Sequence, residues 1–152
     1  MITDDILKRH CELSGWPCVA RASGRLTVAL EVTPAVQADV APTETGVRVF
    51  ANLMDSVAAA AINREAIMTL LRDTAAMVRR VQVVAEKYFG FEVTFQALPS
   101  PEDLDDAFCC LSVACGLAGA ELPALLDEQA AQDFLLVRGV PANVSNQPQP
   151  QQ

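Results

Sequence analysis

Residues 91–111 read FEVTFQALPSPEDLDDAFCCL and contain the change from a strand to a helix that decides the fold. Phe91, Val93 and Phe95 alternate with polar residues, which is the period of a strand with one buried face. Pro99 closes this strand. The run 100–103 (SPED) then predicts a helix start, because serine accepts a backbone N–H, proline suits the first helical position and acids favour the positive helix end.

The N-terminal region predicts a helix followed by a β-hairpin. Residues 3–14 have the apolar period of a short amphipathic helix, with Thr3 as its N-cap and Gly15 at its end. Strands are expected over 18–22 and 25–32, where every second residue of the second strand is apolar. We therefore expect a hairpin with one buried face.

The middle of the chain predicts a loop, a third strand and a long helix. The segment 33–46 contains two prolines and reads as a loop, whereas residues 47–53 alternate again as a strand. From about residue 56 the period changes to that of a helix, which continues to about Val78. Residues 81–87 fit a further strand, although the same apolar residues also fit a longer helix.

The helix that begins near Pro101 has a buried apolar stripe, made of Leu104, Phe108, Leu111 and Cys115. Gly116 and Gly119 weaken it, and the run 121–123 (ELP) can start a second helix that continues to about Gln132. We therefore expect a kink or break there. The apolar run 134–137 is expected to pack on the core, and the Pro/Gln-rich tail, residues 139–152, to be disordered.

These elements predict one α+β domain over residues 1–138. The expected architecture is an antiparallel sheet of about four to five strands packed with three helices, in the order α-β-β-β-α-β-β-α. A chain of 152 residues is long enough to bury a core without disulfides or metal.

The charge of the chain disfavours polyanionic partners. The formal net charge is −8, and nucleic-acid binding depends on Lys and Arg that neutralise phosphates. No Lys or Arg lies between Lys87 and Arg138, whereas that segment contains nine acidic residues, namely Glu92, Glu102, Asp103, Asp105, Asp106, Glu121, Asp127, Glu128 and Asp133. We expect no nucleic-acid partner and an acidic C-terminal half.

The N-terminus and the cysteines predict a soluble cytoplasmic protein. Asp4 and Asp5 stand where a secretory signal peptide carries basic residues, and no apolar run reaches the roughly 18 residues of a membrane span. The five cysteines, at positions 11, 18, 109, 110 and 115, are an odd number, which fits a reducing compartment. A disulfide or shared metal site that involves Cys11 and Cys18 is left open by the spacing.

Residues that could support catalysis are few. His10 is the only histidine, and we expect a packed or surface side chain. Cys109, Cys110 and Cys115 have no CxxC spacing, so core thiols are expected. The acidic run 102–106 reads as a solvated helix start and not as a calcium loop. Nucleotide-binding, hydrolase and zinc-protease motifs are absent from the sequence. We therefore expect no enzyme activity, cofactor or metal.

Arg79 and Arg80 form a basic doublet at the end of the predicted long helix. Such a pair can interact with the negative end of the preceding helix, or it can face an acidic partner. The first role is the expected one.

The element order, size and acidity resemble the class I type III secretion chaperones of bacteria, the Tir chaperone or CesT family. The resemblance is carried by residues 6–17, the strand 26–31, the strand 47–53 before the helix at 62–78, and the segment 91–104. It covers roughly residues 3–130. The related YbjN-like proteins fit nearly as well, and the interruptions at Gly116, Gly119 and Pro123 depart from the continuous terminal helix of the chaperone family.

The resemblance implies a homodimer that binds an extended segment of a secreted effector by its sheet and first helix, without ATP or metal. An added strand can pair with a free sheet edge while apolar patches accept its side chains. The implied partner-binding residues are Leu26, Val28, Leu30, Val49, Phe91, Val93 and Phe95. The implied dimer interface lies on the long helix at Ile67, Leu70, Leu71 and Met77.

Two alternatives are weighed against the chaperone. The first is a structural or assembly subunit of a phage or secretion machine, whose acidic face and Gln/Pro tail contact neighbouring subunits. The second is a small enzyme that uses the thiols at positions 109, 110 and 115, which would require accessible cysteines with a substantial thiolate fraction.

Overall fold

One antiparallel sheet forms the centre of the molecule in a computed structural model, which describes residues 2–22, 25–55 and 61–139. Within these residues the sheet has six strands in the order β1-β2-β3-β4-β6-β5. The strands are β1 Cys18–Ala20, β2 Leu26–Ala29, β3 Gln37–Pro42, β4 Val47–Asp55, β5 Gln82–Ala85 and β6 Tyr88–Phe95. The helices are α1 Asp4–Leu13, α2 Ala61–Met77, α3 Pro101–Glu121, the 3₁₀ helix η1 Leu122–Leu126 and α4 Glu128–Val137.

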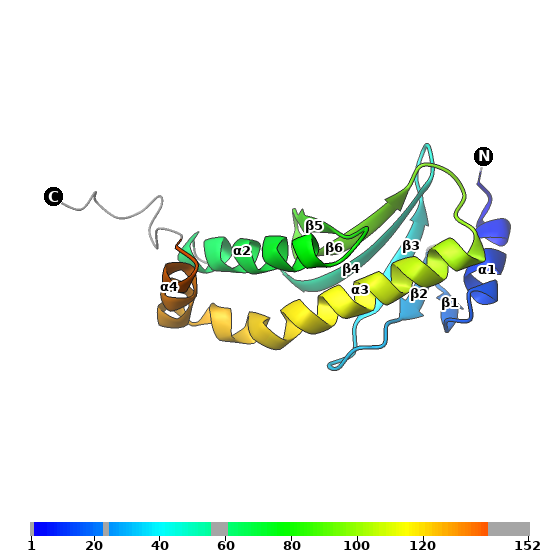
Figure 1. Ribbon diagram of the computed structural model, residues 1–152. Coiled ribbons are helices and arrows are strands. Elements are labelled where there is room, and N and C mark those ends of the chain that lie inside the picture. The colour runs from blue at the N-terminus through cyan, green and yellow to red at the C-terminus, as the bar shows by residue number, and fades with distance from the viewer. Residues whose placement is uncertain (1, 23–24, 56–60, 140–152) are drawn as a thin grey trace, which may run out of the picture.

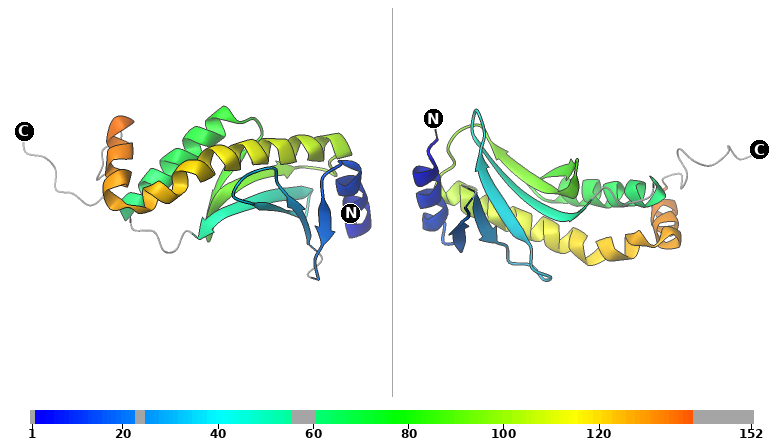
Figure 2. Two further views of the ribbon diagram at one scale, coloured as in Figure 1. Left: turned by 90° about the horizontal axis from the view of Figure 1, so that it is seen from below. Right: turned by 180° about the vertical axis from the view of Figure 1, so that it is seen from behind.

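The helices α2 and α3 lie side by side on one face of the sheet (Figure 1; Figure 2, left). The helix α1 packs at one end of the molecule, beside β1 and the start of α3, and α4 packs against α2 at the other end (Figure 1). The core lies between the sheet and the helices. The largest fully buried side chains include Phe89, Phe91, Phe108, Ile67 and Leu71.

The strands β4 and β6 are the longest in the sheet and pair from Val47–Phe95 to Asp55–Tyr88, with an irregularity between Asn52 and Met54. Gly90 lies inside β6, opposite Asn52. A Cβ atom at Gly90 would collide with the Ala51 carbonyl oxygen. The two strands therefore approach closely at this point because residue 90 has no side chain.

The α+β prediction is confirmed, and the predicted strand over 81–87 is present as β5. The counts differ, since the described residues contain six strands and four α-helices. The extra strand, β3, lies inside the segment 33–46 that was predicted to be a loop. Pro42 is the last residue of β3, where it does not interrupt the pairing. Of the buried residues of β3, Ala38 is small, so the apolar alternation of Ala38 and Val40 was weak in the sequence.

The C-terminal region also differs from its prediction. The helix α3 continues through Gly116 and Gly119 to Glu121, and the break comes at η1, whose second residue is Pro123. The helix α4 begins only at Glu128, with the Asp127 carboxylate accepting from the Ala130 N–H at 2.9 Å, and includes the run 134–137. The predicted helix start at 56–60 and nearly all of the predicted disordered tail, residues 140–152, lie outside the described residues.

The helical segment Pro101–Leu126 is long and apolar enough to cross a membrane, because an 18-residue window within it has a mean hydropathy of 1.7. This departs from the expectation that no run approaches that length. Only 39% of the apolar window is buried within the fold. The buried residues of α3, among them Leu104, Phe108 and Leu111, pack in the core, whereas Val113 and Leu117 are exposed. The core helix of a soluble protein can have the same length and hydropathy.

Candidate binding groove

The residues predicted to bind a partner lie in the core of the molecule. Leu26, Val28, Leu30, Val49, Phe91 and Val93 are buried, and Phe95 is partly buried. Their alternation marks the face of the sheet that packs on the helices, because apolar side chains of a half-buried strand point to the core. The prediction therefore selected core residues, whose side chains are not accessible at the surface.

The predicted dimer residues show the same pattern on α2. Ile67, Leu70 and Leu71 are buried, whereas Met77, at the end of the helix, is 70% exposed. The apolar stripe of α2 therefore packs within the chain.

The other face of the sheet is covered by its own charged side chains. Phe50 lies on this face, yet it is only 7% exposed, because the guanidinium groups of Arg25 and Arg48 lie 5.6 Å and 4.1 Å from its ring centre. Arg48 also pairs with Glu92, and Arg25 pairs with Asp39 at 3.5 Å. Among the described residues, the middle of this face is therefore a network of paired charges around Phe50.

An apolar groove of about 550 Å³ lies beside the C-terminal half of α3. Its walls are the segment 32–37, the end of β4 from Asn52 to Met54, and the residues Cys115, Gly119, Leu122, Pro123 and Leu126 of α3 and η1. Ligand sites in proteins have volumes of roughly 300–1,000 Å³ and mostly apolar linings. The groove therefore has the size and the chemistry of a binding site.

Local hydrogen bonds hold each wall of the groove. In the loop before β3, the Leu30 N–H donates to the Val36 carbonyl at 3.0 Å. The Glu31 N–H donates to the Ser112 hydroxyl at 3.1 Å, which ties this loop to α3. The Asn63 side chain of α2 donates to the Leu125 carbonyl of η1 at 2.8 Å. The groove is therefore formed by the folded chain itself, since its walls are fixed from several elements.

The exposed charged residues next to the groove in the sequence, Glu31, Glu121 and Asp127, are all acidic, and we call them the acidic rim. Asp39 is the only charged residue that lines it among the described residues, and exposed Glu31, Glu121 and Asp127 each adjoin a lining residue in the sequence. Asp39 and Arg25 pair with each other, so the net negative charge beside the groove comes from Glu31, Glu121 and Asp127. A ligand with positive charges beside its apolar part would therefore be favoured.

The five cysteines are free thiols. Burial raises the pKa of Cys115, at the edge of the groove, and of Cys11 to about 12. Burial and the neighbouring Asp105 raise the pKa of Cys109, and burial and Asp106 raise that of Cys110. A raised pKa leaves little thiolate at neutral pH, which disfavours thiol catalysis.

The prediction of core thiols at positions 109, 110 and 115 is correct only for Cys115. Cys109 is exposed and Cys110 is half-buried. The helical period places position 109 on the side of α3 that faces solvent, although its neighbours Phe108 and Leu111 are buried. Over the described part of the chain, no group of three or more His, Cys, Asp and Glu side chains could hold a metal ion.

The sole histidine has a structural position. The His10 Nδ1 atom lies 2.8 Å from the Pro99 carbonyl oxygen, which joins α1 to the start of α3. Trp16 strengthens the same junction, because its Nε1 donates to Asp105 at 2.7 Å and its ring lies 5.5 Å from that of Phe108. The prediction of a packed or surface histidine fits this position.

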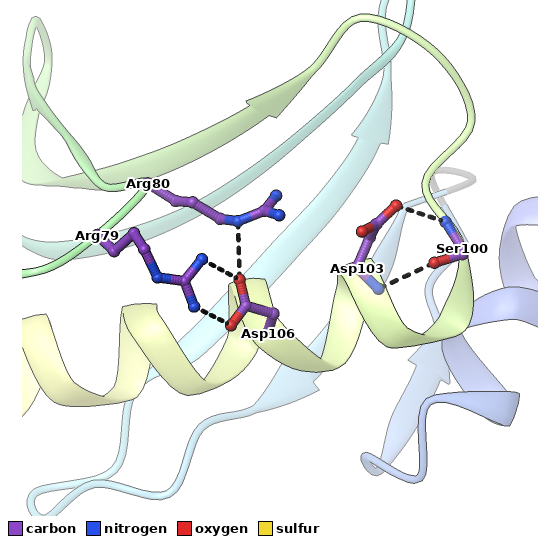
Figure 3. Close-up of polar contacts among 5 residues, drawn as sticks. All are labelled: Arg79, Arg80, Ser100, Asp103 and Asp106. Carbon is purple, nitrogen blue, oxygen red and sulfur yellow. Dashed lines mark hydrogen bonds and ion pairs between the residues drawn. The ribbon is translucent and has the colours of Figure 1, made fainter.

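The basic doublet binds an acid of the same chain. Figure 3 shows Arg79 and Arg80 converging on Asp106 of α3, each at 2.7 Å. The helix α2 has already ended at Met77, and Arg80 has a positive φ of 71°. The expected helix-end role is therefore replaced by a link between the α2–β5 connection and α3.

The same figure shows the start of α3, where the Ser100 hydroxyl accepts from the Asp103 N–H and the Asp103 carboxylate accepts from the Ser100 N–H (Figure 3). This is a complete capping box. The predicted helix start is confirmed, and Asp103, Asp105 and Asp106 are engaged within the fold.

Sequence reasoning missed the groove. Its walls come from the predicted loop 33–46, from the end of β4 and from the predicted helix break, so no single periodic segment marks it. One signal was present in the sequence, since Gly116 and Gly119 stand in a helix that does not need them for its backbone.

Compared with known protein families, curated proteins and solved structures, the chain shows no significant match. The resemblance to type III secretion chaperones therefore stays a prediction.

Proposed function

We propose that this chain is a binding protein of the chaperone type, which holds an extended apolar segment of another polypeptide, as the class I type III secretion chaperones hold an effector. The groove beside α3 supports this role, because it is apolar, open along one side and formed by the folded chain. Catalysis is not part of the proposal.

The acidic rim narrows the class of partner. A segment with apolar residues at its centre and Lys or Arg at its ends places its positive charges beside Glu31, Glu121 and Asp127. Complementary charges raise the association rate and disfavour acidic competitors. The proposed partner is therefore an apolar segment with basic flanks.

An array of 15-residue peptides tests this proposal. Each peptide has alternating apolar residues at its centre and Lys, Ser or Glu at both ends, and the labelled full chain is applied. We expect binding to decrease in the order Lys, Ser, Glu. Equal binding of the Glu-flanked peptides, or binding of none, contradicts the proposal.

A second measurement locates the bound peptide. Amide chemical shifts of the ¹⁵N-labelled chain are recorded with and without the best Lys-flanked peptide. We expect the largest changes at groove residues such as Val36, Leu53 and Leu122, and small changes at Arg48 on the charged sheet face. The reverse pattern would place the binding site elsewhere and overturn the assignment to the groove.

We further propose that the chain is a homodimer whose contact lies on the exposed side of α3. Val113 and Leu117 are 54% and 46% exposed and lie one turn apart on α3. Burying two such faces against each other removes apolar surface from water. We expect a solution mass near twice 16.3 kDa, reduced to one chain in the double variant Val113→Ser, Leu117→Ser.

The alternative of an assembly subunit makes a different prediction for the same measurement. A ring or larger particle would favour a structural component, whose neighbouring copies would cover α3. A monomeric mass at all concentrations would contradict the dimer proposal. The peptide array would then decide the peptide-binding proposal independently.

A further inference from the structure

Gly119 is a residue that the fold of α3 does not require. It lies in the helix interior, where glycine costs roughly 1 kcal/mol relative to alanine. Its φ is not positive, whereas among the described glycines Gly15 and Gly139 have positive φ values. The helix backbone therefore accepts alanine at this position.

Packing does not explain Gly119 either. A Cβ atom built there would have no heavy atom within 4 Å outside its chain neighbours and its own helix backbone. Gly90 differs, because a Cβ there would strike the backbone of β4, and Gly46 would strike Phe95 in the same way. The two strand glycines thus have structural reasons that Gly119 lacks.

The space in front of Gly119 belongs to the groove. Gly119 lines it together with Cys115, one turn before, and Leu122, nearly one turn after. These residues share one side of the helix. The missing side chain at position 119 therefore widens the groove between the side chains of its neighbours.

We propose that Gly119 sets the specificity of the groove, by leaving room for one bulky apolar side chain of the bound segment, of the size of leucine or phenylalanine. This inference rests on the proposed peptide-binding function. The guest side chain packs over Gly119 against Leu122 and Leu126, and the basic flanks of its segment meet the acidic rim. The partner is thus an extended peptide with one large apolar residue at its centre.

Variants at position 119 separate binding from folding. Gly119→Leu fills the space from within, whereas Ala120→Leu adds the same side chain at the next, exposed position, which does not line the groove. Gly119→Ala is the mildest change. Because alanine has a higher helix propensity than glycine, we expect Gly119→Ala to raise the melting temperature of the chain by about 2–4 °C.

The experiment measures the affinity of Lys-flanked 15-residue peptides with Ala, Leu or Phe at the centre by fluorescence anisotropy. For the wild-type chain we expect the Leu and Phe peptides to bind about tenfold or more tightly than the Ala peptide, because a large apolar side chain is buried. Gly119→Leu should remove this preference and weaken the Phe peptide about tenfold. Ala120→Leu should bind as the wild type does.

The outcomes distinguish the two proposals. If no peptide binds the wild-type chain, both the peptide-binding function and the role of Gly119 are overturned. If peptides bind but Gly119→Leu retains the preference for Phe, or if Ala and Phe bind equally well, only the role of Gly119 is overturned. A lower melting temperature of Gly119→Ala would also contradict it, since glycine would then be required by the fold.

Discussion

The two halves of α3 differ in their charge and in what their side chains contact. In the N-terminal half, Asp103 caps the helix, Asp105 binds Trp16 and Asp106 binds Arg79 and Arg80. The C-terminal half has no charged residue between Asp106 and Glu121 and borders an open apolar groove. The polar groups of the first half stabilise the fold, whereas the second half leaves apolar side chains exposed.

The largest expected effect comes from removing the aromatic anchor of the N-terminal half. Phe108 is fully buried and its ring lies against that of Trp16. We expect Phe108→Ala to lower the free energy of unfolding by about 3–5 kcal/mol, measured by urea denaturation. Leu136→Ala, at an exposed position of α4 outside the groove and the proposed dimer contact, should change it by less than about 0.5 kcal/mol. Similar losses for both variants would mean that α3 is not packed as described.

A smaller effect is expected where η1 is tied to α2. Asn63 is buried and donates to the Leu125 carbonyl, so Asn63→Ala leaves that carbonyl without its partner. We expect a loss of about 1–3 kcal/mol in the free energy of unfolding. Amide exchange should become faster in η1 and unchanged in β6. Thr69→Ala, which removes a hydrogen bond to the Glu65 carbonyl within the same helix, serves as the control. An equal change in both variants would contradict a specific link to the groove.

The buried thiols predict that stability falls at alkaline pH. Unfolded thiols ionise near pH 9, whereas folded Cys11 and Cys115 stay protonated up to about pH 12. The unfolded state therefore loses protons first, and the stability that is complete below pH 9 decreases as the pH rises toward 12. We expect about 1.4 kcal/mol per pH unit for each thiol in urea denaturation.

The single variants Cys11→Ala in α1 and Cys115→Ala in α3 separate the contributions of the two thiols to this titration. Each should remove part of the slope between pH 9 and pH 12. If neither variant changes the slope, other groups cause the alkaline loss and the thiols are less buried than the structure indicates.

The smallest expected effect concerns the capping box. Ser100→Ala removes the acceptor of the Asp103 N–H, and we expect a loss of about 1 kcal/mol in the free energy of unfolding. Exposed Glu102→Gln, in the same turn, should change it by only a few tenths of that, about 0.3 kcal/mol. Peptide binding should be unchanged in both variants, because the box lies in the other half of α3 from the groove. A loss of binding in Ser100→Ala would show that the two halves are coupled.

The features that the sequence predicted correctly are those that depend on residues close together in the chain. The Ser100 cap, the Thr3 cap and the alternation in β2, β4 and β6 each depend on neighbours within a few residues, and the structure has them. The strand β3 was missed because its inward residues include alanine, which marks a buried position weakly. The helix break was placed too early because Gly116 and Gly119 weaken a helix without ending it, whereas Pro123 ends it.

The residues predicted to bind a partner lie in the core, for a physical reason. Hydrophobic periodicity identifies the side of an element that is removed from water, and in this chain that side is the core. Leu26, Val28 and Phe91 therefore looked like a binding surface but are buried beneath the helices. A binding surface is instead the apolar remainder that folding leaves open, which depends on which elements meet.

The sequence by itself determined the α+β class, the strand and helix periods, the caps of α1 and α3 and the acidity of the C-terminal half, because these follow from local propensity and composition. Only the tertiary structure decided where the basic doublet binds, which thiols are buried and that the loop before β3, the end of β4 and η1 enclose a groove at Gly119. Those features join residues far apart in the chain, and packing in three dimensions, not the order of residues, brings them together.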